Sequence, residues 1–174
     1  MAVLPILIYP DPILKQKSIP VEIIDDEIVN LAENMLETMY QAPGTGVGLA
    51  APQVGRNQRL IVIDINRRAE EPGDSKPIIL VNPEIVESEG EIIYDEGCLS
   101  VPGYTVDITR SEKIKVCGLD LQGNSVEIEA DELLAIILQH EIDHLDGNLI
   151  IDHVSSLKRE LYRRKLKKAQ QEND

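Results

Sequence analysis

Two histidines and a glutamate, His140, Glu141 and His144, form a His-Glu-x-x-His pattern near the end of this 174-residue chain. In a helix, positions i and i+4 lie on one face, so both imidazoles can bind one metal ion. The carboxylate of Glu141 then stands beside a water molecule bound to that ion. Because the pattern also arises by chance in unrelated helices, hydrolytic metal chemistry depends on a third ligand.

The third ligand of many metallopeptidases follows downstream, in the extended pattern His-Glu-x-x-His-x-x-Gly-x-x-His. Gly147 occupies the required glycine position, but Ile150 stands where the ligand should be, and His153 comes three residues too late. Upstream, Cys98 follows Gly97 and precedes small polar groups, which suits a thiolate ligand outside a regular strand. A Cys-His-His site leaves a fourth position for water, the mark of a catalytic metal site.

The two cysteines, Cys98 and Cys117, also allow simpler explanations. Cys98 could be a buried free thiol, or it could form a disulfide with Cys117. Cys117 lies in a run whose alternation places Ile114 and Val116 on the opposite face, as expected for an ordinary strand residue. With no recognisable secretion signal, two cysteines favour a reducing compartment, in which a thiolate ligand survives.

A run over residues 44–55 is too rich in glycine for a helix and too apolar for an ordinary solvated loop. We expect it to bring the backbone close to a ligand. The run lacks the Gly-x-Gly-x-x-Gly fingerprint of dinucleotide-binding proteins and the Gly-Lys-Ser/Thr ending of a phosphate-binding loop. A nucleotide site is therefore disfavoured.

Taken together, these three segments resemble the signature of the peptide deformylase family. Residues 46–53 match its Gly-apolar-Gly-apolar-Ala-Ala-x-Gln motif, and residues 96–100 its Glu-Gly-Cys-apolar-Ser motif. Residues 139–147 match its Gln-His-Glu-x-Asp-His-Leu-x-Gly motif. Residues 9–14 also resemble the opening of the family, so the resemblance covers residues 1 to about 155.

The resemblance implies a hydrolase that removes the formyl group from the N-terminal formyl-methionine of nascent polypeptides and releases formate. It implies one divalent metal ion held by Cys98, His140 and His144. Glu141 would take the proton of a water molecule activated by the metal and pass it to the leaving nitrogen. The resemblance implies Fe²⁺ as the ion. Zn²⁺, Ni²⁺ and Co²⁺ are alternatives, because a thiolate and two imidazoles suit all four ions.

The resemblance also assigns groups that contact the substrate. The backbone N–H of Leu99 and the side-chain amide of Gln53 would stabilise negative charge on the formyl oxygen. The peptide beyond the methionine is expected to pair with Gly48 and with the segment near Gly103 and Tyr104. By family position, the substrate-binding residues are Val47, Gly48, Tyr94, Gly97, Leu133, Ile136 and Ile137. The last three are equally what the core-facing side of an amphipathic helix would show, so both explanations stay open.

The fold class predicted by the sequence is α+β. Helices are predicted over residues 25–41 and 131–146, and the second, which carries the metal ligands, should end at Gly147. Antiparallel or mixed sheets should pack around this central helix, because short apolar runs occupy residues 60–65, 78–86, 91–94, 114–121 and 125–129. With no Trp or Phe, the core must be aliphatic.

The domain organisation expected is a single catalytic domain over residues 1–154, followed by a basic C-terminal helix and tail over residues 155–174. A length of 174 residues suffices to bury about 70% of the unfolded surface. The segment over residues 67–76 is polar and contains a proline, and it is predicted to be a loop.

Charged residues are distributed unevenly along the chain. Residues 155–174 carry seven basic and three acidic side chains, a net charge of +4, whereas residues 1–154 carry −18. A solubilising surface is the common explanation for such a terminal helix, and docking on ribosomal RNA near the polypeptide exit is the alternative that the resemblance implies. We expect no DNA contact, no membrane span and a monomer, in the bacterial cytoplasm or in an organellar matrix or stroma.

Two other function classes are weighed against the deformylase. A metallopeptidase that cuts internal peptide bonds would need a ligand where Ile150 stands. A binding module in which the metal only holds the fold together would need a fourth protein ligand, and the sequence offers no evident one. Formate release from a formylated peptide separates the deformylase from both.

Overall fold

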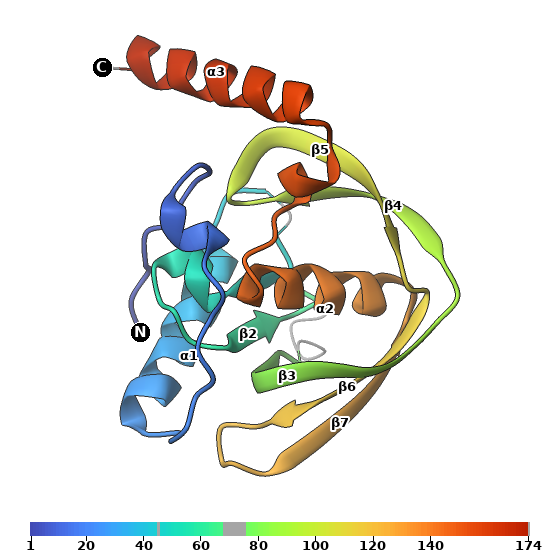
Figure 1. Cartoon of the computed structure of the whole chain (residues 1–174). Helices are drawn as coiled ribbons and strands as arrows, with labels where there is room; N and C mark the ends of the chain where they lie inside the picture. The colour runs from blue at the N-terminus through green and yellow to red at the C-terminus, as the bar shows by residue number, and fades with distance from the viewer. Residues whose placement is uncertain (45, 68–75, 174) are drawn as a thin grey trace.

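The computed structural model describes residues 1–44, 46–67 and 76–173. Three α-helices are present, with bounds α1 Asp26–Gln41, α2 Glu132–Leu145 and α3 Ser156–Glu172 (Figure 1). Three short 3₁₀ helices, η1 Pro12–Lys15, η2 Ala51–Val54 and η3 Ile150–His153, connect the larger elements. The loop predicted over residues 67–76 falls mostly on residues 68–75, which lie outside the described residues.

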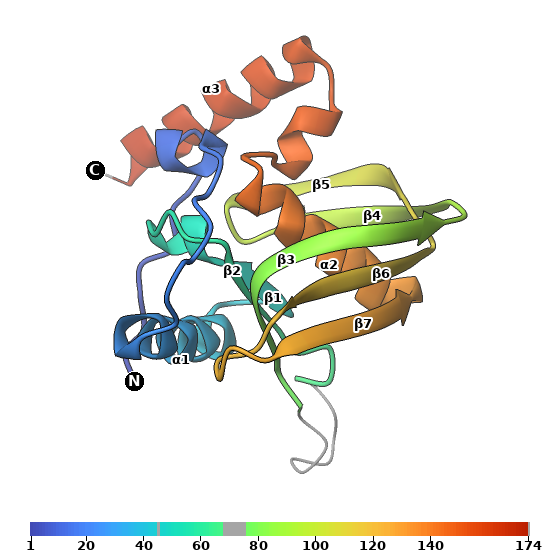
Figure 2. The same ribbon diagram turned by 60° about the horizontal axis from the view of Figure 1, so that its bottom comes forward.

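The strands form two antiparallel sheets. The larger sheet has the order β1-β2-β3-β6-β7, with bounds β1 Gly48–Ala50, β2 Leu60–Ile63, β3 Ile78–Glu89, β6 Lys113–Leu119 and β7 Ser125–Asp131. The smaller sheet is a hairpin of β4 Ile92–Cys98 and β5 Val101–Arg110. Figure 2 shows the hairpin and the larger sheet side by side, with α2 behind them. The predicted α+β class is confirmed.

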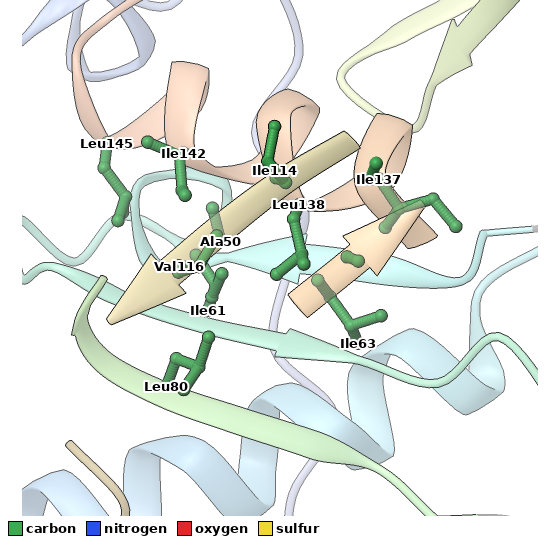
Figure 3. Packing of buried hydrophobic residues seen from close by; sticks show 12 residues of the cluster. Ala50, Ile61, Ile63, Leu80, Ile114, Val116, Ile137, Leu138, Ile142 and Leu145 are labelled. Carbon is green, nitrogen blue, oxygen red and sulfur yellow. The ribbon is translucent and has the colours of Figure 1, made fainter. Parts of the chain in front are cut away.

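The helix α2 packs one face against the larger sheet and turns its opposite face toward the hairpin. Leu138, Ile142 and Leu145 of α2 meet Ile61 and Leu80 of the sheet, and all five side chains are buried (Figure 3). Each such burial stabilises the fold by roughly 1.5–3 kcal/mol. The helix is therefore held along its length, which fixes whatever its other face carries.

The strand β2 is buried on both of its faces, which explains why its sequence is apolar without alternation. Ile61 and Ile63 belong to the cluster under α2, whereas Leu60 and Val62 belong to a second cluster formed with α1. Strands covered on two sides read as continuous apolar runs. The helix α1 begins after Asp25, whose side chain accepts a hydrogen bond from the Ile28 N–H, within one residue of the predicted start.

The helix predicted over residues 131–146 is confirmed, with Asp131 and Asp146 as its caps. Gly147 follows with φ of +80°, the left-handed conformation that glycine adopts at little cost. A Cβ at this position would lie 2.5 Å from the Lys15 carbonyl oxygen. The predicted end of the helix therefore depends on glycine for both conformation and space.

Two strands were not predicted. β1 lies within the glycine-rich run, and β5 is interrupted in sequence by Pro102 and Gly103, which hide its alternation. The basic C-terminal helix is present as α3 and exposes most of its side chains, but Tyr162 is buried. None of the helices in the described part of the chain has the length and apolar composition that a bilayer span requires.

Candidate functional site

The two histidines of α2 lie one turn apart and face each other through their ring nitrogens. The Nε2 atoms of His140 and His144 are 3.2 Å apart. His144 is fully buried, and His140 lies toward the solvent side of the same face. The opposite face of α2 packs against the larger sheet, which holds the helix in place. The i, i+4 spacing then puts the two rings on one face of the helix.

The tip of the β4–β5 hairpin brings a thiol to these rings. Cys98 is the last residue of β4, so the expectation that it lies outside a regular strand is wrong: the strand itself carries the thiol to the hairpin tip. Its Sγ lies 3.4 Å from His144 Nε2. The ligand atoms of Cys98, His140 and His144 all lie within 4.8 Å of one another. Cys117 is a free cysteine on β6, so the disulfide considered as an alternative is wrong.

This group of three fits a divalent metal ion. Ligands at the corners of a tetrahedron, bound at about 2.0–2.3 Å, lie roughly 3.3–3.6 Å apart. The observed separations of 3.2 and 3.4 Å agree with that expectation. Within the described residues the group has three members, so a fourth corner is left for water or substrate.

The ligands considered downstream lie elsewhere. Ile150 is buried in the cluster under the hairpin, and His153 faces Asp143 with Nε2 3.9 Å from its carboxylate. Neither of these residues joins the group of Cys98 and the two histidines.

Behind His140 lies a buried network of charged side chains that the sequence did not reveal. His140 Nδ1 lies 2.8 Å from Glu96 Oε1, so a ring that donates there presents Nε2 to the metal position. Arg110 donates through Nε and Nη2 to both oxygens of Glu96, and it also contacts Asp143 of α2. Arg110 and Glu96 are only 7% and 4% exposed, so each needs the other.

The ionisation of this network follows from its contacts. Burial raises the pKa of Glu96, but hydrogen bonds from Arg110 and His140 outweigh it and lower the pKa below its ordinary value. Burial alone would lower the pKa of His140, yet Cys98 and Glu96 raise it well above its ordinary value. The groups that favour a proton on this ring, Cys98 and Glu96, also favour the binding of a metal cation.

His144 has the opposite character. Burial, together with the positive charges of His140 and Arg110, lowers the pKa of His144 well below its ordinary value. The ring is therefore neutral and can offer a lone pair to a metal ion. One imidazole is thus oriented by a carboxylate, and the other is kept neutral by burial.

Glu141 stands beside the three ligands as a buried carboxyl group. One of its oxygens, Oε2, has no hydrogen-bond partner among the described residues. Burial raises the pKa of Glu141 to about 7. A Cβ at Gly48 of β1 would lie 2.5 Å from Glu141 Oε1, so only glycine lets the strand pass the carboxyl group this closely.

Gln53, on η2, is held in one orientation by three contacts. Its Oε1 accepts a hydrogen bond from the Ala50 N–H at 2.9 Å, and its Nε2 donates to Ser100 Oγ at 3.1 Å and toward Cys98 Sγ at 3.6 Å. The amide N–H groups therefore point at the hairpin tip, where Leu99 follows Cys98. Gln53 is thus held as a hydrogen-bond donor beside the Cys98 thiol.

These groups open into a cleft of about 800 Å³. All residues that the sequence predicted to bind substrate line it, as do Gly103 and Tyr104: Val47, Gly48, Tyr94, Gly97, Leu133, Ile136 and Ile137. Of the three helix residues left open, Ile136 and Ile137 are also buried, whereas Leu133 is 42% exposed. Ile136 and Ile137 therefore belong both to the buried side of the helix and to the lining of the cleft. Leu133 is better explained as a lining residue of the cleft.

The cleft has a floor and a rim. The floor is Cys98, His140, Glu141 and His144, with the last buried behind the other three. The rim is formed by Gly46, Val47, Pro102, Gly103, Tyr104 and Leu133.

Arg67 supports one side of the rim, and no pattern in the sequence predicted this role. Its guanidinium donates to the carbonyl oxygen of Tyr40 at 2.7 Å, to that of Ala42 at 3.2 Å, and to that of Gly46. The first two carbonyls lie at the end of α1, where a cation is favoured by the helix dipole. Arg67 thus links the end of α1 to the rim.

The comparisons with known proteins agree with this geometry. A family model described as polypeptide deformylase matches residues 3–160. A peptide deformylase of Alkalilimnicola ehrlichii is 52% identical over 168 residues, covering 97% of this chain and 91% of the relative. A peptide deformylase of Thermodesulfovibrio yellowstonii is 53% identical over 167 residues, covering 96% of this chain and 98% of the relative.

Solved structures show the same likeness over the whole chain. A peptide deformylase from Legionella pneumophila superposes with a TM-score of 0.87 at 47% identity, covering 99% of this chain and 98% of that chain. A peptide deformylase from Ehrlichia chaffeensis in complex with actinonin gives a TM-score of 0.88 at 40% identity, covering 97% and 98%. Given the matched length and the identity, this chain belongs to the polypeptide deformylase family.

Proposed function

We propose that the floor of the cleft carries out the reaction of this family, the removal of the N-formyl group from nascent polypeptides. The observation that carries the proposal is the buried, unpartnered oxygen of Glu141 beside the group of Cys98, His140 and His144. A buried carboxyl oxygen without a hydrogen-bond partner does not stabilise the fold. Its position is better explained by contact with a water molecule and a substrate. The products are formate and a free N-terminal amine.

The metal ligands in this proposal are Cys98, His140 and His144. When bound, the ion supplies Lewis acidity, which lowers the pKa of water toward 7 and polarises a carbonyl group. We propose Fe²⁺ as the native ion, with Zn²⁺, Ni²⁺ or Co²⁺ as substitutes, because one thiolate and two imidazoles suit each of them. Metal analysis of protein purified without oxygen tests the choice, and zinc alone in such protein would contradict it.

Glu141 moves the proton. Its carboxylate takes a proton from the attacking water as the new C–O bond forms at the formyl carbon, and returns it to the nitrogen as the C–N bond breaks. A group that must accept and then donate needs a pKa near neutrality, and burial gives Glu141 a pKa of about 7. Gly48 keeps β1 close enough to exclude bulk water from that carboxyl group.

Gln53 and Leu99 meet the negative charge that develops on the formyl oxygen. The Gln53 amide is already fixed by Ala50 and Ser100, so it loses little freedom when the charge appears. The Leu99 N–H follows the thiol ligand directly in sequence and is carried on the same hairpin tip. A donor of this kind is typically worth about 3 kcal/mol of barrier.

The methionine side chain is proposed to occupy the apolar part of the cleft. Val47, Leu133, Ile136 and Ile137 line it, and a flexible thioether is recognised there by shape and burial. Gly48 and the segment near Gly103 and Tyr104 offer backbone groups to the peptide that follows, an extended pairing that reads little sequence. Gly97 lines the cleft beside them. We therefore expect broad tolerance after the first residue.

Formate release from a formyl-methionine tripeptide tests the proposal. Glu141→Gln should keep the bound metal, because it alters no ligand, and should lose turnover by at least about 10²-fold. Glu160→Gln, which changes an exposed carboxylate on α3, is the matched control and should behave like the unaltered chain. Turnover that persists in Glu141→Gln with full metal content would refute the role of this carboxylate.

The two competing function classes have no support in the structure. A metallopeptidase of the extended pattern lacks its ligand, because Ile150 is buried and apolar. A metal that only holds the fold together calls for a fourth protein ligand, and the group has three among the described residues.

A small molecule offers a second test of the cleft. The Ehrlichia chaffeensis relative was solved in complex with actinonin, and we propose that this chain binds the same compound. A ligand present at 100 times its Kd stabilises the folded state by about 2.7 kcal/mol. Thermal unfolding should therefore shift upward with actinonin, and an unchanged midpoint at saturating concentration would contradict the proposal.

We also propose that residues 1–154 form the catalytic domain and that α3 docks on ribosomal RNA. Support comes from the charge of −18 on residues 1–154 against +4 on residues 155–174, and from the exposure of the basic side chains on α3. Tyr162 packs against the body, so deleting α3 would disturb more than charge. A charge change that leaves Tyr162 in place is the cleaner variant.

Co-sedimentation with ribosomes over a range of salt concentrations is the measurement. Replacing Arg163, Arg164, Lys167 and Lys168 by Gln should weaken binding and reduce its salt dependence, since each phosphate contact contributes to the slope. A set of Glu→Gln changes at Glu87, Glu127 and Glu129, on the sheet surface, is the matched control. Equal binding by the α3 variant and the unaltered chain would rule out the docking.

We also propose an oligomeric state and a cellular location for this protein. The site draws all its residues from one chain, which supports a monomer, and light scattering at working concentration tests it. The similar proteins named above come from bacteria, and formylated nascent chains are met where they are made. We therefore propose the bacterial cytoplasm, with an organellar matrix or stroma as the alternative, and fractionation of the source cells tests this.

A further inference from the structure

The rim next to the floor contains three residues that the sheet does not hold. In the described register of β4 and β5, Cys98 pairs with Val101 and Gly97 with Thr105. Pro102, Gly103 and Tyr104 therefore have no partner across the hairpin. A bulge of this kind leaves its residues unpaired and bends the strand that carries it.

Gly103, at the centre of this bulge, has a left-handed backbone and open space beside it. Its φ is +72°, and a Cβ built on it would have no atom within 4 Å. The segment is thus neither paired with a strand nor packed at its centre. Its position relative to the cleft must be set by contacts at its two ends.

Tyr162 of α3 supplies those contacts. Its hydroxyl donates to the Pro102 carbonyl oxygen at 2.7 Å. Its ring packs against Tyr104, with centroids 5.0 Å apart, and against Tyr9, with centroids 6.2 Å apart. Burial, followed by the charge of the Cys98 thiolate, raises the pKa of Tyr162 to about 12, so the hydroxyl keeps its proton.

The rest of α3 contributes little to this contact. Tyr162 is the one buried residue of the helix, and Leu166, one turn on, is partly buried in the same cluster. Leu157 and Leu161 face solvent. The helix therefore meets the body of the protein through the Tyr162 ring and hydroxyl, through Leu166, and through an ion pair of Arg159 with Asp152 at 3.6 Å. Figure 1 shows the first turn of α3 close to β5.

We propose that Tyr162 is a positioning residue for the peptide-binding rim, through which α3 sets the affinity for substrate residues that follow the formyl-methionine. The inference rests on the proposed function, because it concerns the same cleft. Pro102, Gly103 and Tyr104 line the cleft beyond the floor, so their placement bears on the peptide and not on the formyl group. Loss of the contact should weaken binding of longer substrates while the reacting atoms stay in place.

The test compares two substrates of different length, formyl-methionine amide and a formyl-methionine tripeptide. Tyr162→Phe removes only the hydroxyl, and we expect KM for the tripeptide to rise about threefold, the size of a modest net hydrogen bond. Tyr162→Ala also removes the ring contacts, and we expect about a tenfold rise. In both variants kcat, and KM for the amide, should stay unchanged.

Leu161→Ala is the matched control, since it alters an exposed side chain on the same turn of α3 and should change neither substrate. Thermal unfolding confirms that Tyr162→Phe is folded. The proposal is overturned if KM rises equally for both substrates, if only kcat changes, or if neither variant differs from the unaltered chain. Failure of the unaltered chain to release formate would instead count against the proposed function.

Discussion

Behind the floor of the cleft, buried polar side chains pair with one another, whereas at the rim, glycines and half-exposed apolar side chains are held by a few distant contacts. Glu96 and Arg110 fix His140 through hydrogen bonds inside the protein. The rim depends on Arg67 on one side and on Tyr162 on the other.

This difference separates two tasks. Hydrolysis needs atoms placed to a fraction of an ångström, and buried charge networks provide that because any displacement leaves a charge unpaired. Acceptance of many peptides needs a surface that can adjust, and unpaired backbone next to glycine provides it. Changes at the floor should therefore cost stability or turnover, and changes at the rim should alter KM.

The largest effect is expected from Arg110→Met. Removing the guanidinium leaves Glu96 as a buried carboxylate without its partner, which typically costs about 3–5 kcal/mol. Urea unfolding of the metal-free proteins measures it. Arg164→Met, which breaks an exposed pair with Glu160, should stay within about 0.5 kcal/mol, and equal losses in the two variants would remove the distinction between floor and surface.

Gly48→Ala should come next, with an effect on turnover rather than on folding. The added Cβ would lie 2.5 Å from Glu141 Oε1, and the end of that side chain can move aside. A displacement of about 1 Å in a catalytic group costs on the order of 10²-fold in rate. Gly46→Ala meets only the end of the Leu99 side chain, at 3.0 Å, so its kcat should fall by less than about threefold.

Neighbouring residues of α2 allow a sharper comparison. Ile136→Ala removes a buried side chain, only 3% exposed, and should cost about 2–5 kcal/mol in unfolding. Leu133→Ala, at 42% exposure, should cost less than about 1 kcal/mol but raise KM for formyl-methionine substrates. An unchanged KM in Leu133→Ala would show that this residue plays no part in binding.

The smallest effect is expected from Arg67→Gln. The variant weakens the hydrogen bonds donated to the Tyr40, Ala42 and Gly46 carbonyl oxygens. One side of the rim then loses its support, while the residues of the floor keep their contacts. KM should rise about twofold to threefold with kcat unchanged, on the scale of one net hydrogen bond. Initial-rate kinetics at several substrate concentrations measure both values, and a fall in kcat alone would place Arg67 with the floor instead.

Much of the site was predictable because its spacing is local. His140 and His144 lie within one helix, and both ends of that helix follow from its caps and from Gly147. Cys98 was predicted from its ligand chemistry and from the family resemblance, because no local sequence pattern connects it with His140 and His144, more than 40 positions away. The three segments of the resemblance therefore predicted the floor and the lining of the cleft.

The supporting contacts were not predictable in the same way. Arg110 continues the buried positions Val106 and Ile108 of β5, and an arginine in a buried register signals a buried partner, but Pro102 and Gly103 conceal that strand. Tyr162 lies among charged residues of α3, and its partner Pro102 is 60 positions away. Such pairings arise from tertiary packing and leave no local pattern.

The tip of the β4–β5 hairpin carries a thiol at Cys98 and a backbone donor at Leu99, and the bulge at Pro102 to Tyr104 follows directly after it. Substitutions at the tip itself, at Cys98 and Leu99, would disturb the reacting centre, whereas substitutions at the bulge would act on the bound peptide. The opposite side, held by Arg67, shares no residue with the metal-binding group. Directed evolution toward new peptides should therefore accumulate substitutions around Gly46 and leave the hairpin tip unchanged.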